Sequence, residues 1–218
     1  MKITMLGTGN AQVTECYNTC FVLEEEGRCL LVDGGGGNTL LRQLKRAGYD
    51  WMDMREIFVT HRHVDHLLGI LWMLHMVTLH DGEVREVIGR KTVFFDIQSV
   101  KAKQYGFSMD IGNGRKLTCC GDEPYNDCEE IYARNSDWLL HEAFCLSGEA
   151  DIFRPYEKRH STAKDAAELA EKLGVKNLLL YHTEDKNILK RKELYTAEAE
   201  KYFHGNIFVP EDLETLEL

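Results

Sequence analysis

His61-Arg62-His63-Val64-Asp65-His66 places four metal-binding side chains within six residues. The segment before it, Glu56-Ile57-Phe58-Val59-Thr60, is rich in apolar residues and is typical of a short strand. Because histidines two positions apart in an extended segment point to the same side, the first two can bind one ion. The aspartate and the last histidine come where the apolar pattern becomes helical, so they can face a second ion. The segment therefore predicts a metal centre; the alternative is a set of solvated polar residues at a strand-to-helix turn.

The composition of the 218 residues is that of an ordinary globular protein, with 44% hydrophobic and 28% charged residues. Three prolines and the absence of low-complexity segments predict a single domain over residues 1–218. No apolar run reaches the ~20 residues that span a bilayer, so we expect no membrane partner. Residues 1–5 lack the apolar core and cleavage site of a secretory signal, which predicts a cytoplasmic protein with reduced cysteines.

Apolar patterns and turn residues predict alternating strands and helices without a linker. The glycine run at residues 34–37 is expected to form a tight turn before a helix, with a phosphate-binding loop as the alternative. The predicted helices cover residues 38–47, 67–79, 162–173 and about 194–203. The predicted strands cover residues 1–5, 19–23, 28–33, 56–60, 84–88, 92–98, 105–111, 116–120, 138–140, 177–181 and 207–209.

The metal-binding segment resembles the HxHxDH signature of the metallo-β-lactamase superfamily of metal-dependent hydrolases. Further landmarks of that family follow in order, at residues 6–10, 30–35, 120–122 and 179–182. Two segments, Leu139-Leu140-His141-Glu142-Ala143-Phe144 and His160-Ser161-Thr162, are similar to the paired His-Glu-Ala-Thr and His-Ser-Thr elements of the ribonuclease Z branch. The resemblance implies an α/β fold, a four-layer αββα sandwich with the site at one edge.

The resemblance also implies the ligands of two divalent metal ions, zinc first and manganese as the alternative. The first ion would be bound by His61 and His63, the second by Asp65, His66 and His182. Asp122 would bridge both ions through its two carboxylate oxygens. Asp33, at the end of its strand, is expected to orient a ligand histidine.

The reaction implied by the resemblance is hydrolysis of a phosphodiester by a hydroxide held between the two ions. Asp65 belongs to the catalytic set, and His160 is the candidate general acid or phosphate contact, supported by Glu142 or His141. The alternative for His160 is a polar residue just before a helix. Lys158 and Arg159 precede it and would lie near the same centre.

The chain departs from the family pattern where a third histidine would complete the first metal site. Phe94-Phe95-Asp96-Ile97-Gln98-Ser99 matches that segment, but Gln98 stands at the ligand position. An amide oxygen is a weaker zinc ligand than imidazole, so Gln98 would be a weak or replaced ligand and the first site could be loose or empty.

A second departure concerns the substrate. Residues 98–122 leave no room for the long arm with which ribonuclease Z grips transfer RNA, and the formal net charge of −10 repels a nucleic-acid backbone. We therefore expect a phosphodiesterase for a small or single-stranded phosphodiester, such as a cyclic nucleotide or a short oligonucleotide. Two alternatives stay open: a tRNA 3′-processing endoribonuclease, and a degenerate, non-catalytic member that binds metal or a nucleotide. A homodimer is also left open.

Overall fold

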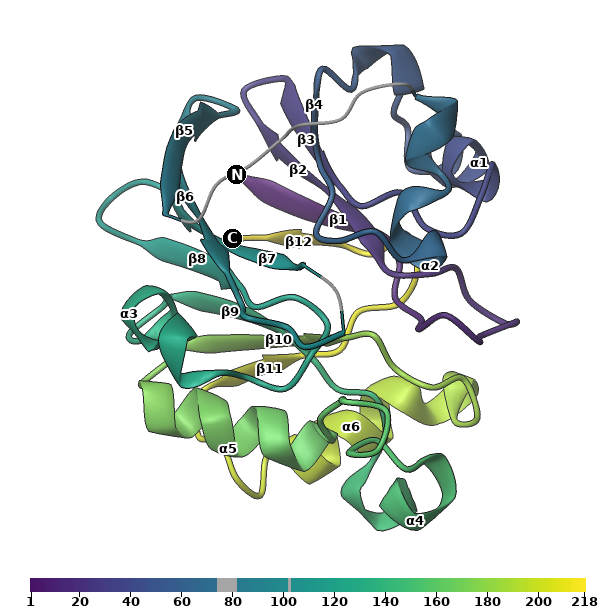
Figure 1. Cartoon of the computed structure of the whole chain (residues 1–218), viewed down its shortest axis with the longest axis vertical. Coiled ribbons are helices and arrows are strands. Elements are labelled where there is room, and N and C mark those ends of the chain that lie inside the picture. The colour runs from purple at the N-terminus through teal and green to yellow at the C-terminus, as the bar shows by residue number, and fades with distance from the viewer. Residues whose placement is uncertain (74–81, 102) are drawn as a thin grey trace.

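Two β-sheets form the centre of the molecule (Figure 1). The computed structural model describes residues 1–73, 82–101 and 103–218. The five-stranded sheet has the order β12-β1-β2-β3-β4 and the seven-stranded sheet the order β11-β10-β9-β8-β7-β6-β5. The strands are β1 (Lys2–Gly7), β2 (Cys20–Glu25), β3 (Arg28–Val32), β4 (Glu56–Phe58), β5 (Glu83–Val87), β6 (Arg90–Asp96), β7 (Tyr105–Asp110), β8 (Lys116–Cys119), β9 (Trp138–Glu142), β10 (Asn177–Tyr181), β11 (Asn206–Phe208) and β12 (Thr215–Glu217).

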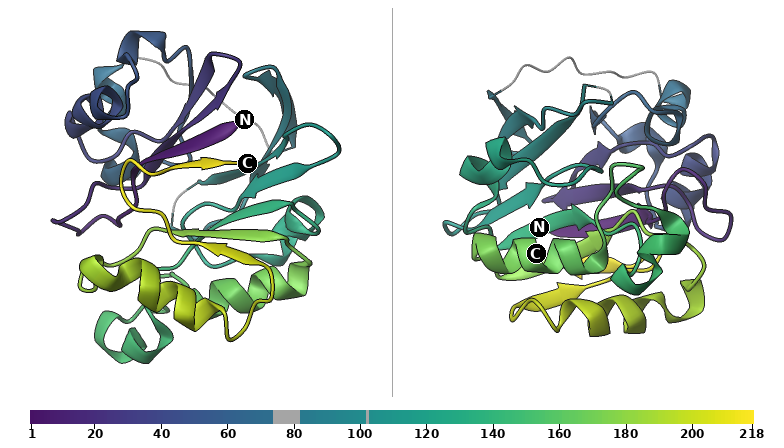
Figure 2. Two further views of the ribbon diagram at one scale, coloured as in Figure 1. Left: turned by 180° about the vertical axis from the view of Figure 1, so that it is seen from behind. Right: turned by 60° about the horizontal axis from the view of Figure 1, so that its bottom comes forward.

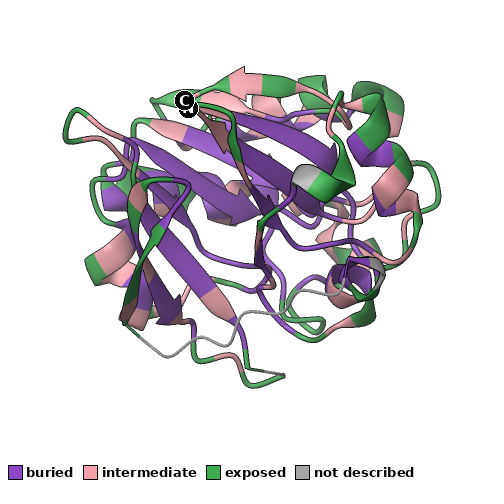
Figure 3. Cartoon of the chain, turned by 90° about the horizontal axis from the view of Figure 1, so that it is seen from above, coloured by how far each residue is buried: buried purple, intermediate pink, exposed green. Residues whose placement is uncertain are grey.

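The two sheets pack face to face through alternate apolar side chains. One core cluster combines residues of the first sheet, such as Met5 and Phe21, with residues of the second, such as Phe107 and Leu140. Because successive side chains of a strand point to opposite faces, the intervening residues face the helices instead. Figure 3 shows the buried strands between more exposed outer segments. The predicted αββα sandwich is confirmed.

Helices cover the outer face of each sheet (Figure 2). On the five-stranded sheet, α1 (Thr39–Arg46) contributes Leu40 and Leu44 to an apolar cluster with strand residues. On the seven-stranded sheet lie α5 (Ala163–Leu173) and α6 (Arg191–Ala199). Three further helices are short: α2 (Val64–Leu67), α3 (Glu130–Ala133) and α4 (Ala150–Phe153). No helix in the described part of the chain has the length and apolar content that a membrane crossing requires.

The sequence of α5 accounts for its position and its ends. Thr162 and Asp165 form a reciprocal capping box at its start, and Gly174 ends it in the left-handed conformation. Its buried face consists of four alanines and Leu173, and these small side chains let the helix lie close to the sheet. The predicted helix at residues 162–173 is confirmed to within one residue.

The helix predicted at residues 67–79 is wrong where the structure can be compared with it. The α-helix here is α2, which ends at Leu67, and a 3-10 turn follows at Ile70–Trp72. The backbone N–H of Gly69 donates to Gly35 O at 3.0 Å instead of continuing the helix. A Cβ at Gly69 would lie 1.9 Å from Gly34 O, so only glycine allows this close approach. Residues 74–79 of the prediction lie outside the described residues.

The parallel strands of both sheets bring their carboxyl ends to one edge of the sandwich. In the first sheet β3 is parallel to β4, and in the second β8, β9 and β10 are parallel to one another. Each of these strands is followed by, or ends in, a predicted site residue. This topology gathers residues that are far apart in the sequence.

Candidate metal centre

The predicted metal ligands follow three of these strands. His61 and His63 come after β4, His66 lies in the single turn α2, Asp122 follows β8, and His182 follows β10. All are buried except His63, which is half-buried. His182 has a positive φ of 59°, a conformation that costs energy in a non-glycine residue and is found preferentially at functional sites.

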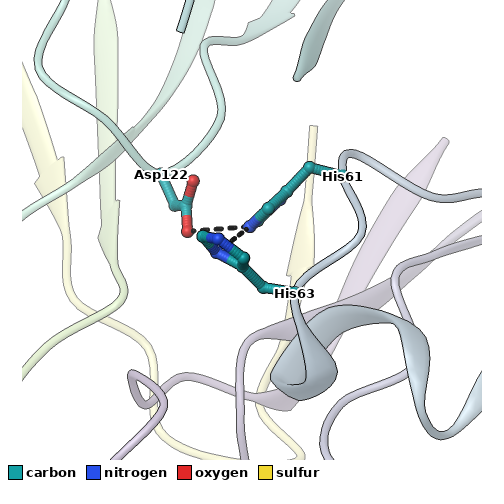
Figure 4. Close-up of side chains that lie close together, drawn as sticks. All are labelled: His61, His63 and Asp122. Atoms are coloured by element: carbon teal, nitrogen blue, oxygen red, sulfur yellow. Dashed lines mark hydrogen bonds and ion pairs between the residues drawn. The ribbon is translucent and has the colours of Figure 1, made fainter. Parts of the chain in front are cut away.

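One group of possible ligands consists of His61, His63 and Asp122 (Figure 4). His61 Nε2 lies 2.8 Å from His63 Nδ1 and 3.5 Å from Asp122 Oδ2. One ligand atom from each of the three residues lies within 4.8 Å of the other two. The three side chains can therefore converge on one ion.

A second group consists of His66, His182 and the same Asp122. Asp122 Oδ2 lies 3.3 Å from His66 Nε2 and 3.8 Å from His182 Nε2. Asp65 is next to this group, with its Oδ2 3.3 Å from His66 Nε2. A single carboxylate oxygen thus faces three imidazole nitrogens from two different sheets.

Two atoms of the centre are buried without a hydrogen-bond partner, His66 Nε2 and Asp122 Oδ1. Burying polar atoms without partners is costly, and such atoms are rare in folded proteins unless a water or an ion completes them. Imidazole nitrogens and carboxylate oxygens together are the ligands that divalent transition metals such as zinc take in proteins. The residues present therefore fit a divalent cation.

Hydrogen bonds hold the inner histidine in place. His66 Nδ1 donates to Asp33 Oδ2 at 2.7 Å, which turns its Nε2 toward Asp122. The same Asp33 carboxylate accepts from Thr60 N at 2.7 Å and from Thr60 Oγ1 at 2.8 Å. Asp33 adopts a positive φ of 57°, and its contacts are those of a residue that orients a ligand. The ring of His182 is held by Thr19, whose Oγ1 lies 3.3 Å from His182 Nδ1.

The electrostatic environment of most of these residues favours the protonation state that binds a metal ion, which is neutral for histidine and ionised for aspartate. Burial lowers the pKa of His61 to about 4 and that of His182 to about 3, because a charged imidazolium loses its hydration when it is buried. Burial alone would raise the pKa of Asp122, but the nearby His66 and the imidazoles of His61 and His182 lower it overall. Burial opposes ionisation of Asp65 too, yet its contacts with His66 lower its pKa to about 2.

His66 differs from His61 and His182. Burial would lower its pKa, but the charge of Asp33 and the nearby carboxylates of Asp122 and Asp65 raise it well above the usual value. A cation bound at His66 Nε2 would compete with a proton for this nitrogen and would interact with the same carboxylates.

The two predicted catalytic loops lie side by side beyond the metal ligands. Phe144 N donates to Ser161 O at 2.9 Å, and Glu142 accepts a short hydrogen bond from Ser161 N. His160 Nδ1 lies 3.4 Å from Glu142 Oε2, and its ring is stacked on Phe144 with centroids 4.6 Å apart. Glu142 and Phe144 thus fix the plane and direction of the His160 ring.

His141 is not placed where a catalytic support would act. Its side chain is buried, and Nδ1 bonds to the carbonyl oxygen of Glu142 at 2.8 Å. His141 does not line the cavity described next. In a strand, neighbouring side chains point to opposite faces, so His141 and Glu142 cannot both reach the centre.

A cavity of ≈ 200 Å³ opens over the metal centre. It is lined by predicted site residues and by others that sequence reasoning did not assign to the site: Asn10, Ala11, Gln12, His63, Asp65, Lys101, Asp122, Phe144, Lys158, His160 and His182. Lys158 was expected near the centre, but no sequence signal separated Lys101 from the other surface lysines.

Gln98 lies away from the site. It is exposed, has a positive φ of 57° and does not line the cavity. Its backbone N–H donates to Asp96 Oδ1 at 2.9 Å, which forms a turn at the end of β6. Lys101, three residues further on, is the cavity-lining residue of this segment.

Fold and centre together define a metal-dependent hydrolase with the metallo-β-lactamase fold. The chain is similar to ribonuclease Z-like members of the metallo-β-lactamase superfamily. The family model described as Anti-Pycsar protein Apyc1 matches residues 1–94. Ribonuclease Z of Nitrosopumilus maritimus is 24% identical over an alignment of 306 residues that covers 100% of both chains.

Solved structures agree on the fold. The metallo-β-lactamase fold protein YhfI from Bacillus subtilis has a TM-score of 0.81 at 16% identity, covering 99% of this chain and 98% of that one. The short form of human tRNase Z has a TM-score of 0.75 at 21% identity, covering 100% and 99%. The alignment with the N. maritimus enzyme is 306 residues long, whereas this chain has 218, so that relative contains segments without a counterpart here.

Proposed function

We propose that the protein is a metal-dependent phosphodiesterase that acts on a small or single-stranded phosphodiester. The observation that carries the proposal is the position of Asp122 Oδ2, which lies 3.5, 3.3 and 3.8 Å from the Nε2 atoms of His61, His66 and His182. A buried carboxylate facing several imidazoles from both sides suits a bridge between two cations.

In this proposal the chain binds two divalent ions, with zinc as the first choice and manganese as the second. His61 and His63 bind the first ion, Asp65, His66 and His182 bind the second, and Asp122 contacts both. Bound ions would lower the pKa of a water molecule and neutralise negative charge that develops on a phosphoryl group. Among the described residues, His61 and His63 are the two imidazoles of the first group, which would make the first ion the weaker one.

His160 is the proposed proton donor to the leaving oxygen or contact to the phosphate. Its Nδ1 faces Glu142, so Nε2 is the ring nitrogen left for the substrate. The Glu142 carboxylate, itself held by Ser161 N, lies beside His160 Nδ1 and orients the ring. Phe144 keeps the ring from rotating out of the cavity.

Three observations favour a small substrate. The cavity measures ≈ 200 Å³, below the volume of about 300–1,000 Å³ usual for drug-sized ligands. The net charge is −10, which disfavours a long nucleic-acid backbone. The chain has 218 residues, whereas its alignment with N. maritimus ribonuclease Z is 306 residues long, so this chain lacks segments that the relative has. We also infer that residues 1–218 act as one hydrolase domain, because both sheets contribute ligands.

The first experiment is elemental analysis of the protein after incubation with zinc or manganese and removal of excess metal. We expect about two ions per chain, and hydrolysis of bis(p-nitrophenyl) phosphate, cyclic mononucleotides or short oligonucleotides by the loaded protein. Fewer than about one ion per chain would contradict the two-ion centre. Two ions without hydrolysis of any phosphodiester would favour the non-catalytic, metal- or nucleotide-binding alternative.

The second candidate function is tRNA 3′-processing, favoured by the ribonuclease Z name of the N. maritimus relative and by the fold of human tRNase Z. The same protein preparation can be given precursor tRNA and the small phosphodiesters in parallel. Cleavage of precursor tRNA with a higher kcat/KM than any small substrate would replace our first proposal with this one.

A further inference from the structure

The cavity over the metal centre contains two fixed positive charges, although the protein is acidic as a whole. Among the described residues that line it, Lys101 and Lys158 alone carry a permanent cation. Both are exposed residues on loops, one between β6 and β7 and the other between α4 and α5. An anionic substrate that approaches a chain of net charge −10 needs such local cations near the point of binding.

Neighbouring groups hold the ammonium group of Lys101 in place. Its Nζ donates to Arg159 O at 3.3 Å and lies 3.9 Å from Glu123 Oε1. Glu123 is buried and is itself fixed by hydrogen bonds from Ser99 Oγ at 2.7 Å and Gln104 Nε2 at 3.0 Å. An ammonium group has three N–H donors, so the hydrogen bond to Arg159 O leaves capacity for an anion in the cavity.

The ammonium group of Lys158 is held by an aromatic ring. Its Nζ lies 4.8 Å from the centroid of Phe144, which lines the same cavity and is stacked on His160. A cation over a ring face is attracted by the π-electrons and loses part of its freedom to move into solvent. The contact between Lys101 Nζ and Arg159 O joins the two lysine loops, because Arg159 follows Lys158 directly.

We propose that Lys101 and Lys158 form a two-ammonium clamp that binds non-bridging phosphate oxygens of the substrate at the mouth of the cavity. The inference rests on the proposed function and specifies how the phosphate is recognised. Lys101 lies three residues after Gln98, the position at which the family pattern has a third metal-binding histidine. This segment therefore contributes a positive charge to the cavity instead of a metal ligand. In the clamp both lysines are positioning residues for the phosphate and do not bind metal.

The test measures binding of inorganic phosphate to the metal-loaded protein by calorimetry at low salt. Lys101→Met and Lys158→Met should each raise the Kd for phosphate about tenfold, as expected for the loss of one charge-assisted hydrogen bond. The metal content per chain should not change. Lys101→Arg keeps the charge and should restore binding to within about threefold of the original protein.

Lys103→Met is the matched control. Lys103 is two residues from Lys101, but its ammonium pairs with Asp96 and lies 5.3 Å from the Tyr105 ring centroid, and it does not line the cavity. Its removal should leave the Kd for phosphate unchanged.

Several results would overturn the clamp. These are a Kd for phosphate that neither methionine variant changes, an equal loss in Lys103→Met, undetectable phosphate binding by the original protein, or metal loss in Lys101→Met. The proposed function has a separate criterion, because phosphate binding does not require hydrolysis. If the original protein hydrolyses no phosphodiester but binds phosphate through the two lysines, the clamp stands and the phosphodiesterase assignment fails.

Discussion

The metal centre and the outer rim of the cavity above it are built in different ways. We call the buried group His61, His66, Asp122 and His182 the inner wall; Asp122 and His182 line the cavity, and the Nε2 atoms of the three histidines lie 3.3–3.8 Å from Asp122 Oδ2. The rim consists of Gln12, Lys101 and Lys158, all exposed and on loops. His61, Asp122 and His182 follow strands and His66 lies in α2, whereas rim residues lie on loops, where backbone geometry is less constrained.

This difference separates two properties of the site. Rigid strand ends and buried hydrogen bonds fix where cations can bind, so the wall determines the type of chemistry. The loops of the rim can change without disturbing that geometry, so we expect the rim to determine which anion enters. Variants of the wall should therefore lose metal and activity together, and variants of the rim should change substrate affinity alone.

The largest effect is expected from Asp122→Asn in the inner wall. The amide keeps the shape but removes the negative charge that faces three imidazoles, so cation binding at both groups should weaken. We expect metal content to fall and phosphodiesterase activity to drop by more than the ~10–100-fold typical of residues that only support ligands. Elemental analysis and kinetics of the same sample measure both.

A matched control for this variant is Asp127→Asn, five residues away on the surface. It should change neither metal content nor activity. If Asp122→Asn retained full metal content and full activity, the wall would not be the metal centre, and the contrast with the rim would have no basis.

A smaller effect is expected from Asp33→Asn, which tests the support of the wall. Asparagine tolerates the positive φ at this position, so the backbone should be kept. The His66 Nδ1 donor would face a neutral amide instead of a carboxylate, and metal affinity should fall by about 10–100-fold. Competition with a chromogenic chelator measures the affinity. Unchanged affinity would show that Asp33 does not orient His66.

Outside the metal centre, Glu129 gives a prediction for stability and its dependence on pH. It ends the 3-10 turn Asp127–Glu129, is fully buried, and accepts from Asn126 N at 2.8 Å. Burial raises its pKa from 4.5 to about 8, so the folded state binds more protons than the unfolded state between these values. Stability from this group is therefore lost as pH rises through the window, by a few kcal/mol at about 1.4 kcal/mol per pH unit.

Glu129→Gln removes the ionisation and keeps an oxygen for Asn126 N. Urea unfolding should find the variant more stable than the original protein at about pH 9, with a smaller difference at about pH 5. Glu130→Gln, at the next and partly exposed position, should show no alkaline gain. A pH-independent difference for Glu129→Gln would mean that this carboxyl group does not titrate in the window.

Most of the fold could be predicted from local patterns. Regular alternation and turn residues located the hairpin of β2 and β3, where Glu26 and Gly27 both adopt positive φ, and the capped helix α5. The pattern failed after His66 because a tertiary contact, Gly69 N–H to Gly35 O, replaces the helical hydrogen bond. The strand β12 was missed because its pairing with β1 joins residues more than 200 positions apart.

The inner wall was more predictable than the rim for a physical reason. Metal ligands are restricted to a few residue types at fixed spacing after strands, so His61, His63 and His66 were visible as a motif. Of the two alternatives for the support of His160, Glu142 lies beside His160 Nδ1, whereas His141 Nδ1 bonds to the carbonyl oxygen of Glu142. Lys101 and Gln12 could not be found, since lysine and glutamine are common on any surface and only the folded loops place them at the cavity.

The smallest effect is expected from Gln98→His, which tests where the metal-facing wall ends. If Gln98 occupied a ligand position, histidine would give the first ion an additional imidazole and raise metal content or affinity. The structure instead has Gln98 exposed and outside the cavity, so metal affinity and activity should stay within about twofold of the original protein. Chelator competition and elemental analysis of Gln98→His decide between the two outcomes. A gain in affinity would show that residue 98 can reach the metal centre, and Lys101 would then lie near a metal ligand. No gain would show that residue 98 and Lys101 belong to the rim.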